Sequence, residues 1–192
     1  TTLGMKHIGL QRNNARDAFT TDSAAGGSAL ATGERHDNRH IAMSGDGEPY
    51  PSLSDYFRDK GRAVGVVTLG NAADATPTAF YGHSVERDNS DELTRCLLDG
   101  RLDLLCGSGM REFTRRADGI DLVGALKEKY AFVRSVDEME GAQGPVICID
   151  ERMDEAASES NLTLLADATR ASIAKLRERS RNGFFLMVEG AK

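Results

Sequence analysis

Cysteine, long apolar runs and excess positive charge are all scarce in this sequence of 192 residues. Its three cysteines, Cys96, Cys106 and Cys148, are odd in number and lack zinc-site spacing, so they indicate neither a disulfide framework nor a zinc knuckle. We expect them to be small buried apolar residues. No apolar stretch approaches the roughly 20 residues that span a bilayer. The net charge of -6 gives no basic footprint, so we expect neither nucleic acid nor a membrane as partner.

The hydrophobic content of 40% is sufficient for a substantial core, and the length fits one domain over residues 1–192. The chain starts at Thr1 without an initiator methionine or signal peptide, and it stops just after the apolar run "GFFLMVEG". We therefore expect a partial domain, cut from a longer protein, whose compartment cannot be read from this chain.

Strand-like and helix-like patterns alternate along the sequence. Continuous apolar runs bounded by glycine are typical of strands covered on both faces, and they fall at 62–70, 102–107, 144–150 and 183–190. Helical patterns fall between them, at 52–61, at 90–98 and from Leu162 to about Asn182. This alternation predicts an α/β fold with a largely parallel sheet flanked by helices on both faces, and ligands beyond the carboxyl ends of the strands.

The stretch "TTDSAAGGSALATG" (20–33) has almost no side-chain bulk. Its alanines favour a helix over a flexible linker, and Gly33 is a suitable C-cap, so we predict a short buried helix entered at Asp22 and Ser23. The N-terminus of a helix favours bound anions. Ser23 is therefore either an ordinary N-cap or a nucleophile at an anion site, and this stretch alone leaves both possibilities open.

Two other candidate motifs carry little weight. The segment "CGSGMRE" follows a strand like a dinucleotide-binding loop, but Glu112 stands where the third glycine belongs. His36, Asp37 and His40 have the residue types of metal ligands, yet they lie in the polar stretch 36–51 with no strand or helix to fix them. We interpret that stretch as a solvated loop and discard the three residues as ligands.

Chemically useful side chains follow two of the predicted strands. Asp74, Thr76 and Arg87 come after the first strand, and Glu189 ends the last, where a carboxylate is costly unless it is paired or bound to a cation. Taken alone, the first three also suit a plain capped helix, with Asp74 or Thr76 as cap and Arg87 on its solvated face. Together with Ser23 they provide a hydroxyl nucleophile, hard oxygen ligands and a cation suited to phosphate.

The sequence resembles the alkaline phosphatase family. The segment "TDSAAGGSALATG" is similar to the family's nucleophile segment, "DATPTAFYGHSVER" to its next block, and "FFLMVEGAK" to a later metal block. Their order and spacing fit, and the resemblance extends over nearly the whole chain. Two departures, Thr20 for an aliphatic residue and Ser28 for a threonine, touch no reacting group.

The resemblance implies a role for each matching residue. Ser23 would form a phosphoserine intermediate, Arg87 would bind two phosphate oxygens, and Asp22 would orient Arg87. Thr76 and Glu189 would bind magnesium directly, with Asp74 reaching that ion through water. The family also uses two zinc ions, whose ligands would lie mostly before Thr1 and after Lys192.

The resemblance implies a metal-dependent phosphomonoesterase of small phosphate esters, periplasmic or secreted, with the family's three-layer fold incomplete here. We expect the isolated chain to be inactive and to form a homo-oligomer through surfaces that truncation exposes. The alternatives are a phosphodiesterase or sulfatase of the same superfamily, or a non-catalytic folded fragment.

Overall fold

A five-stranded, entirely parallel sheet forms the centre of the computed structural model, which describes residues 6, 12, 14–158 and 163–191. The strand order is β3-β4-β2-β1-β5. The strands are β1 (Ala63–Asn71), β2 (Leu104–Ser108), β3 (Ala131–Val133), β4 (Val146–Ile149) and β5 (Phe184–Glu189). Four of them confirm the predicted strands. The sequence analysis missed β3, because its three residues are too short to produce an apolar run.

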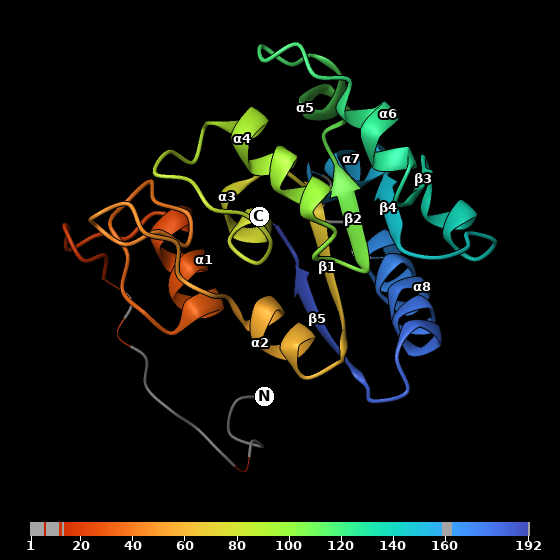
Figure 1. Ribbon diagram of the computed structural model, residues 1–192, viewed down its shortest axis with the longest axis horizontal. Coiled ribbons are helices and arrows are strands. Elements are labelled where there is room, and N and C mark those ends of the chain that lie inside the picture. The colour runs from red at the N-terminus through yellow and green to blue at the C-terminus, as the bar shows by residue number, and fades with distance from the viewer. Residues whose placement is uncertain (1–5, 7–11, 13, 159–162, 192) are drawn as a thin grey trace.

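Helices cover both faces of the sheet, as predicted (Figure 1). One face carries α7 (Arg152–Ser158), α8 (Thr163–Arg179) and the 3-10 turn η3 (Val136–Met139). The other face carries α1 (Ser23–Thr32), α2 (Leu53–Asp59), α3 (Ala75–Thr78), α4 (Ser90–Arg95), η2 (Cys96–Asp99), α5 (Met110–Thr114) and α6 (Leu122–Lys127). The predicted last helix ends at Arg179, earlier than expected, and Leu162 lies outside the described residues.

Alternate residues of the strands divide the core into two clusters. In β1, Val64 and Val66 face the layer that contains α1 and α3, whereas Val67 and Leu69 face α7 and α8. Cys106 and Cys148 are register partners on β2 and β4, fully buried in the second cluster, and Cys96 is partly buried against the first. The expectation of buried cysteines is therefore confirmed for Cys106 and Cys148 and wrong in part for Cys96. None of the helices described is both long and apolar enough to cross a membrane.

His36 corrects the interpretation of the 36–51 stretch as a solvated loop. The stretch has no helix or strand, only isolated bridges, but the His36 side chain is 1% exposed. Its Nε2 lies 2.8 Å from Thr32 Oγ1 and its Nδ1 lies 2.9 Å from the Met43 carbonyl, while its ring meets Tyr50 edge to face. The imidazole therefore fastens the loop to the end of α1, a contact that polar composition did not reveal.

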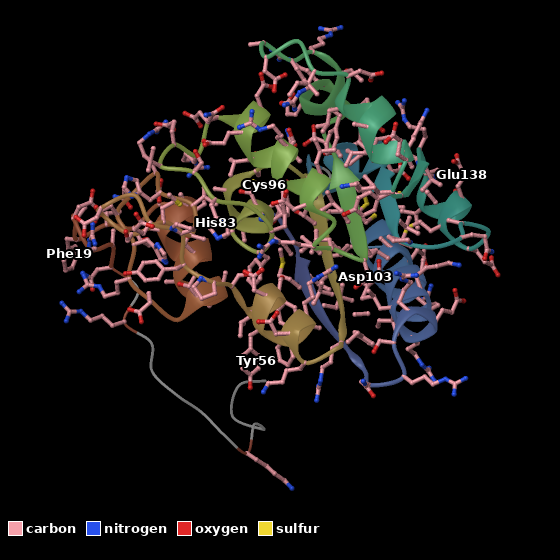
Figure 2. All side chains as sticks on the ribbon, in the orientation of Figure 1. Phe19, Tyr56, His83, Cys96, Asp103 and Glu138 are labelled. Carbon is pink, nitrogen blue, oxygen red and sulfur yellow. The ribbon has the colours of Figure 1, made fainter. Side chains whose placement is uncertain are left out.

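This burial predicts a pH dependence of stability. Burial lowers the pKa of His36 below its ordinary value of about 6.5, so in weak acid the unfolded chain binds a proton that the folded chain does not. Stability should therefore fall as the pH falls from about 7.5 to 5.5. In His36→Gln, whose amide can still donate to the Met43 carbonyl, we expect this pH dependence of the melting temperature to be flatter. The half-buried His83, labelled in Figure 2, gives the control His83→Gln, and an equal flattening there would contradict the assignment.

A close approach of backbones at Gly107 predicts a second effect on stability. A Cβ placed on Gly107 would lie 2.8 Å from Thr68 Cγ2 and 3.0 Å from the Gly70 carbonyl oxygen. We expect Gly107→Ala to destabilise the fold by about 1 to 3 kcal/mol, because β1 and β2 would have to separate there. Gly141, which has nothing within 4 Å of its Cβ position, provides the matched control in thermal melts. Equal melting temperatures for the two variants would refute this explanation.

Candidate active site

Asp22 and Ser23 occupy the start of α1 in different roles. Asp22 is the N-cap, and its Oδ1 accepts a hydrogen bond of 2.8 Å from the Ala25 N–H. Ser23 is the first helical residue and its side chain is exposed. The possibility that Ser23 is the N-cap is therefore wrong, because the neighbouring carboxylate takes that position. Within the part of the chain that the structure describes, the Ser23 hydroxyl makes no hydrogen bond.

The second oxygen of Asp22 joins α1 to two other segments. Asp22 Oδ2 accepts a hydrogen bond of 3.0 Å from the Arg39 N–H and lies 3.3 Å from Arg87 Nη1. Partial burial disfavours the ionised carboxylate, but the N–H groups of Ala25 and Arg39 and the Arg87 guanidinium outweigh it, so the pKa of Asp22 is lowered. Asp22 is therefore an anion at neutral pH, and it fixes Arg87 close to the start of α1.

Arg87 is not on a helix. It lies in the turn between α3 and α4, and its side chain is about one quarter exposed. The alternative that placed Arg87 on the solvated face of a capped helix is therefore wrong. The helix after β1 is only four residues long, and the chain leaves it before Arg87.

Small residues in α1 allow that helix to pack tightly against α3. A Cβ on Gly27 would lie 3.1 Å from Thr76 Cα and 3.6 Å from Thr76 Oγ1. Ser23 is four residues before Gly27, so both lie on the same helix face about one turn apart. The side-chain-poor tract thus lets α1 lie close to α3, with Ser23 one turn before Gly27 on the same face.

Asp74 and Thr76 lie at the carboxyl end of β1, as expected for residues that follow a strand. Asp74 is exposed and occupies the N-cap position of α3, but its side chain makes no capping hydrogen bond there. Thr76 is half-buried within α3. The capped-helix alternative is therefore correct for the position of Asp74 and wrong for its side chain.

Glu189 ends β5 beside β1, where it is the register partner of Thr68. Thr68 Oγ1 donates a hydrogen bond of 2.6 Å to Glu189 Oε2. Among the residues described, Oε1 of the same carboxylate has no hydrogen-bond donor. The Thr68 side chain is buried and Glu189 is half-buried, so Thr68 fixes one oxygen of the carboxylate and leaves the other available.

Glu189 and Ser23 lie on the same side of the sheet. Glu189 alternates in phase with Phe185 and Met187, which pack into the cluster that contains Ala24 of α1 and Ala75 of α3. The last strand contacts α3, and Figure 1 shows the carboxyl end of the chain beside that helix. The structure therefore brings Ser23, Asp22 and Arg87 to the same face and edge of the sheet as the oxygen donors listed next. These donors are Asp74, Thr76 and Glu189.

The donor chemistry at this edge fits one kind of metal better than another. Two carboxylates and a hydroxyl are hard oxygen ligands, and Mg²⁺ needs only one or two protein carboxylates because it retains several waters. Zinc sites need three or four protein ligands. No group of three or more histidine, cysteine, aspartate or glutamate side chains suited to a metal occurs in residues 14–158 and 163–191. The described residues thus fit magnesium and do not by themselves fit zinc.

Sequence reasoning missed the residues that support this site. Thr68 lies inside an apolar run, and Arg39 lies in the loop that we interpreted as solvated. Thr68 reaches Glu189 across 121 positions of sequence, and Arg39 reaches Glu86 across 47. No local signal indicates such contacts.

Comparisons with known proteins agree on one family. The family model described as alkaline phosphatase matches residues 2–192. Alkaline phosphatase 4 of Bacillus subtilis is 30% identical over 187 residues, which are 92% of this chain and 40% of that protein. Streptomycin-6-phosphate phosphatase of Streptomyces griseus is 28% identical, over 92% of this chain and 52% of that protein. The chain thus spans about half, or less, of the length of these relatives.

A solved structure has the same fold. Alkaline phosphatase from the Antarctic bacterium TAB5 superposes with a TM-score of 0.87 at 24% identity, over 97% of this chain and 56% of that one. A histidine variant of the TAB5 enzyme, with Mg bound in its M3 site, superposes with a TM-score of 0.81 at 24% identity, over 96% of this chain and 54% of that one. On the match of the family model to almost its entire length, this chain belongs to the alkaline phosphatase family.

Proposed function

We propose that the protein to which this chain belongs is a metal-dependent phosphomonoester hydrolase, with Ser23 as nucleophile. The observation that carries the proposal is the exposed Ser23 hydroxyl at the N-terminus of α1, next to an arginine that Asp22 holds in place. Family membership supports the reaction class. The relatives are about twice as long as the chain, so we propose the activity for the whole protein, of which residues 1–192 form part of one catalytic domain.

In the proposed reaction the chain's own residues bind and position the phosphoryl group. Ser23 Oγ attacks phosphorus as the ester oxygen leaves, forming a phosphoserine that water then hydrolyses. The free N–H groups at the start of α1 favour the negative charge of the phosphoryl oxygens. Arg87 has a planar fork suited to two of these oxygens, and Asp22 orients it. Catalysis of this kind depends chiefly on positioning and on neutralising charge.

A magnesium ion fits the donor set described above. Thr76 and Glu189 would hold it directly and Asp74 through water. A bound divalent cation supplies positive charge close to the phosphoryl oxygens. We propose that the two zinc ions of the family have most of their ligands outside this chain, and we derive no step of the reaction through them.

Arg87 also favours a phosphate monoester over the alternatives. Its fork suits the terminal dianion of a monoester better than the single charge of a phosphodiester or a sulfate ester. Comparing hydrolysis of an aryl phosphate, a bis-aryl phosphate and an aryl sulfate by the whole protein tests this choice. We expect the aryl phosphate to be cleaved fastest, and the isolated chain to cleave none of them.

We also propose small phosphate esters as substrates, a homo-oligomeric assembly, and a periplasmic or secreted location by analogy with the family. Large exposed apolar side chains support the assembly: Phe19, labelled at the edge of the molecule in Figure 2, is 94% exposed, and Leu30 of α1 is 55% exposed. Light scattering of the isolated chain should report a dimer or larger species, whereas a monodisperse monomer at high concentration would contradict this part of the proposal.

Substitution of Ser23 and substitution of Arg87 should impair the reaction in different ways. Ser23→Ala should lower kcat at least 10³-fold and abolish the phosphopeptide seen by mass spectrometry after acid quenching, because the covalent route is lost. Arg87→Ala should raise the Ki of inorganic phosphate about 10- to 100-fold, because a charge-assisted hydrogen bond contributes roughly 1.5 to 3 kcal/mol. Ser44→Ala, at a loop serine that caps a turn, is the control. A phosphopeptide that persists in Ser23→Ala would refute the nucleophile assignment.

Thr68 provides a test of the magnesium assignment that does not depend on activity. Thr68→Val keeps the shape and β-branching of the side chain but removes the hydroxyl that donates to Glu189. Partners of metal ligands typically contribute 10- to 100-fold to affinity. We therefore expect Mg²⁺ to bind the whole protein about tenfold more weakly in calorimetry, with recovery in Thr68→Ser. Unchanged Mg²⁺ affinity in Thr68→Val would contradict the assignment of Glu189, held by Thr68, as a magnesium ligand.

A further inference from the structure

Arg39 has an unusual backbone conformation for a residue with a side chain. Its φ is 71°, and within the described residues only Ala42 shares a positive φ among those that are not glycine. Such a conformation is unfavourable for any residue with a Cβ, and glycine would adopt it freely. The contacts of Arg39 therefore have to stabilise an arginine at a position that suits glycine.

The Arg39 side chain binds two carboxylates that flank Arg87 in sequence. Arg39 Nε donates to Glu86 Oε2 at 2.9 Å and Nη2 donates to Glu86 Oε1 at 2.5 Å, so the pairing is bidentate. Nη2 also pairs with Asp88 Oδ2. These bonds attach both sides of the turn that carries Arg87 to the loop after α1.

The backbone of the same residue binds the partner of Arg87. The Arg39 N–H donates to Asp22 Oδ2, the oxygen that faces Arg87 Nη1. The preceding residue assists, because Asn38 Oδ1 accepts a hydrogen bond of 2.9 Å from the Asp22 N–H. Arg39 thus connects the carboxylate that orients Arg87 with the turn from which Arg87 extends.

Arg39 also occupies carboxylates that would otherwise compete for Arg87. Asp88 Oδ1 lies only 3.9 Å from Arg87 Nε, and Glu86 is the neighbouring residue on the other side. With Arg39 bound to both, the negative charge of the turn is partly balanced, and the Arg87 fork is left to Asp22 and a bound anion.

We propose that Arg39 is a positioning residue, which holds the Arg87 turn in the geometry that binds phosphate. This inference rests on the proposed function of Arg87 as the residue that binds two phosphate oxygens. Arg39 itself need not touch substrate, since its Nε and Nη2 groups are already bound to the carboxylates of the turn.

Arg39→Gly is the informative variant, because it keeps the backbone N–H to Asp22 and suits the positive φ. In the whole protein we expect the Ki of inorganic phosphate and the KM of an aryl phosphate to rise about three- to tenfold, with kcat changed less than about twofold. The melting temperature should not fall, because glycine relieves the backbone. Arg16→Ala is the matched control: Arg16 forms a similar bidentate pair with Asp37 but touches neither Glu86 nor Asp88, so its Ki should equal that of the native protein.

Two double variants test whether Arg39 acts on phosphate binding through Arg87. In Arg87→Ala protein, adding Arg39→Gly should not weaken phosphate binding further, because a positioning residue has nothing left to position. In Arg39→Gly protein, adding Asp88→Asn should recover part of the lost affinity by removing the competing charge. An unchanged Ki in Arg39→Gly, or an equal loss in the Arg87→Ala background, would overturn the proposal.

A different result would show that the proposed function itself is wrong. If the native whole protein hydrolyses no phosphomonoester and binds no phosphate, the function assigned to Arg87 is wrong. The positioning role of Arg39 is then tested by crystal structures of the native whole protein and of its Arg39→Gly variant. Arg87 should leave Asp22 only in the variant. An Arg87 that stays on Asp22 without the Arg39 side chain would overturn the positioning role in either case.

Discussion

The carboxylate of Asp22 is the interaction on which the arrangement of the candidate site depends. It accepts hydrogen bonds from the N–H groups of Ala25 and Arg39 and faces the guanidinium of Arg87, so three segments meet at one side chain. Hydrogen bonds to a charged group contribute roughly 1.5 to 3 kcal/mol each, more than neutral ones. The same carboxylate starts α1, so the position of Ser23 and that of Arg87 cannot be set independently.

The lack of side-chain bulk in α1 serves the same arrangement. Gly27 allows the helix to approach Thr76 closely, and Ala24 and Ala31 of the same helix are fully buried. Larger residues would move the helix outward and carry Ser23 away from the end of β1. Polar contacts also hold α1 along its length. Asp22 caps its start, Ser28 Oγ accepts a hydrogen bond of 2.8 Å from the Ala42 N–H, and Thr32 pairs with His36 at its end.

The sequence predicted the parts of the molecule that have local signals. The strands of the sheet centre are apolar runs, and α1 has alanines and a C-cap glycine with φ 79°, so both were predictable. Asp74, Thr76 and Glu189 were candidates because they lie at the carboxyl ends of predicted strands, whereas Asp22, Ser23 and Arg87 received their roles from the family resemblance. The short β3, the burial of His36 and the contacts of Arg39 and Thr68 were not, since each depends on what distant segments bring to the same place.

The charges at this edge of the sheet connect metal binding with phosphate binding in the proposed function. Asp22, Asp74 and Glu189 are three carboxylates, and Arg87 is the single cation among the residues assigned to the site. A phosphate dianion brought to such a site meets net repulsion, which is strong where solvent is partly excluded. A divalent cation between Asp74 and Glu189 would cancel this net negative charge and strengthen phosphate binding. Because coupling between two ligands is reciprocal, phosphate would strengthen the binding of the cation by the same factor.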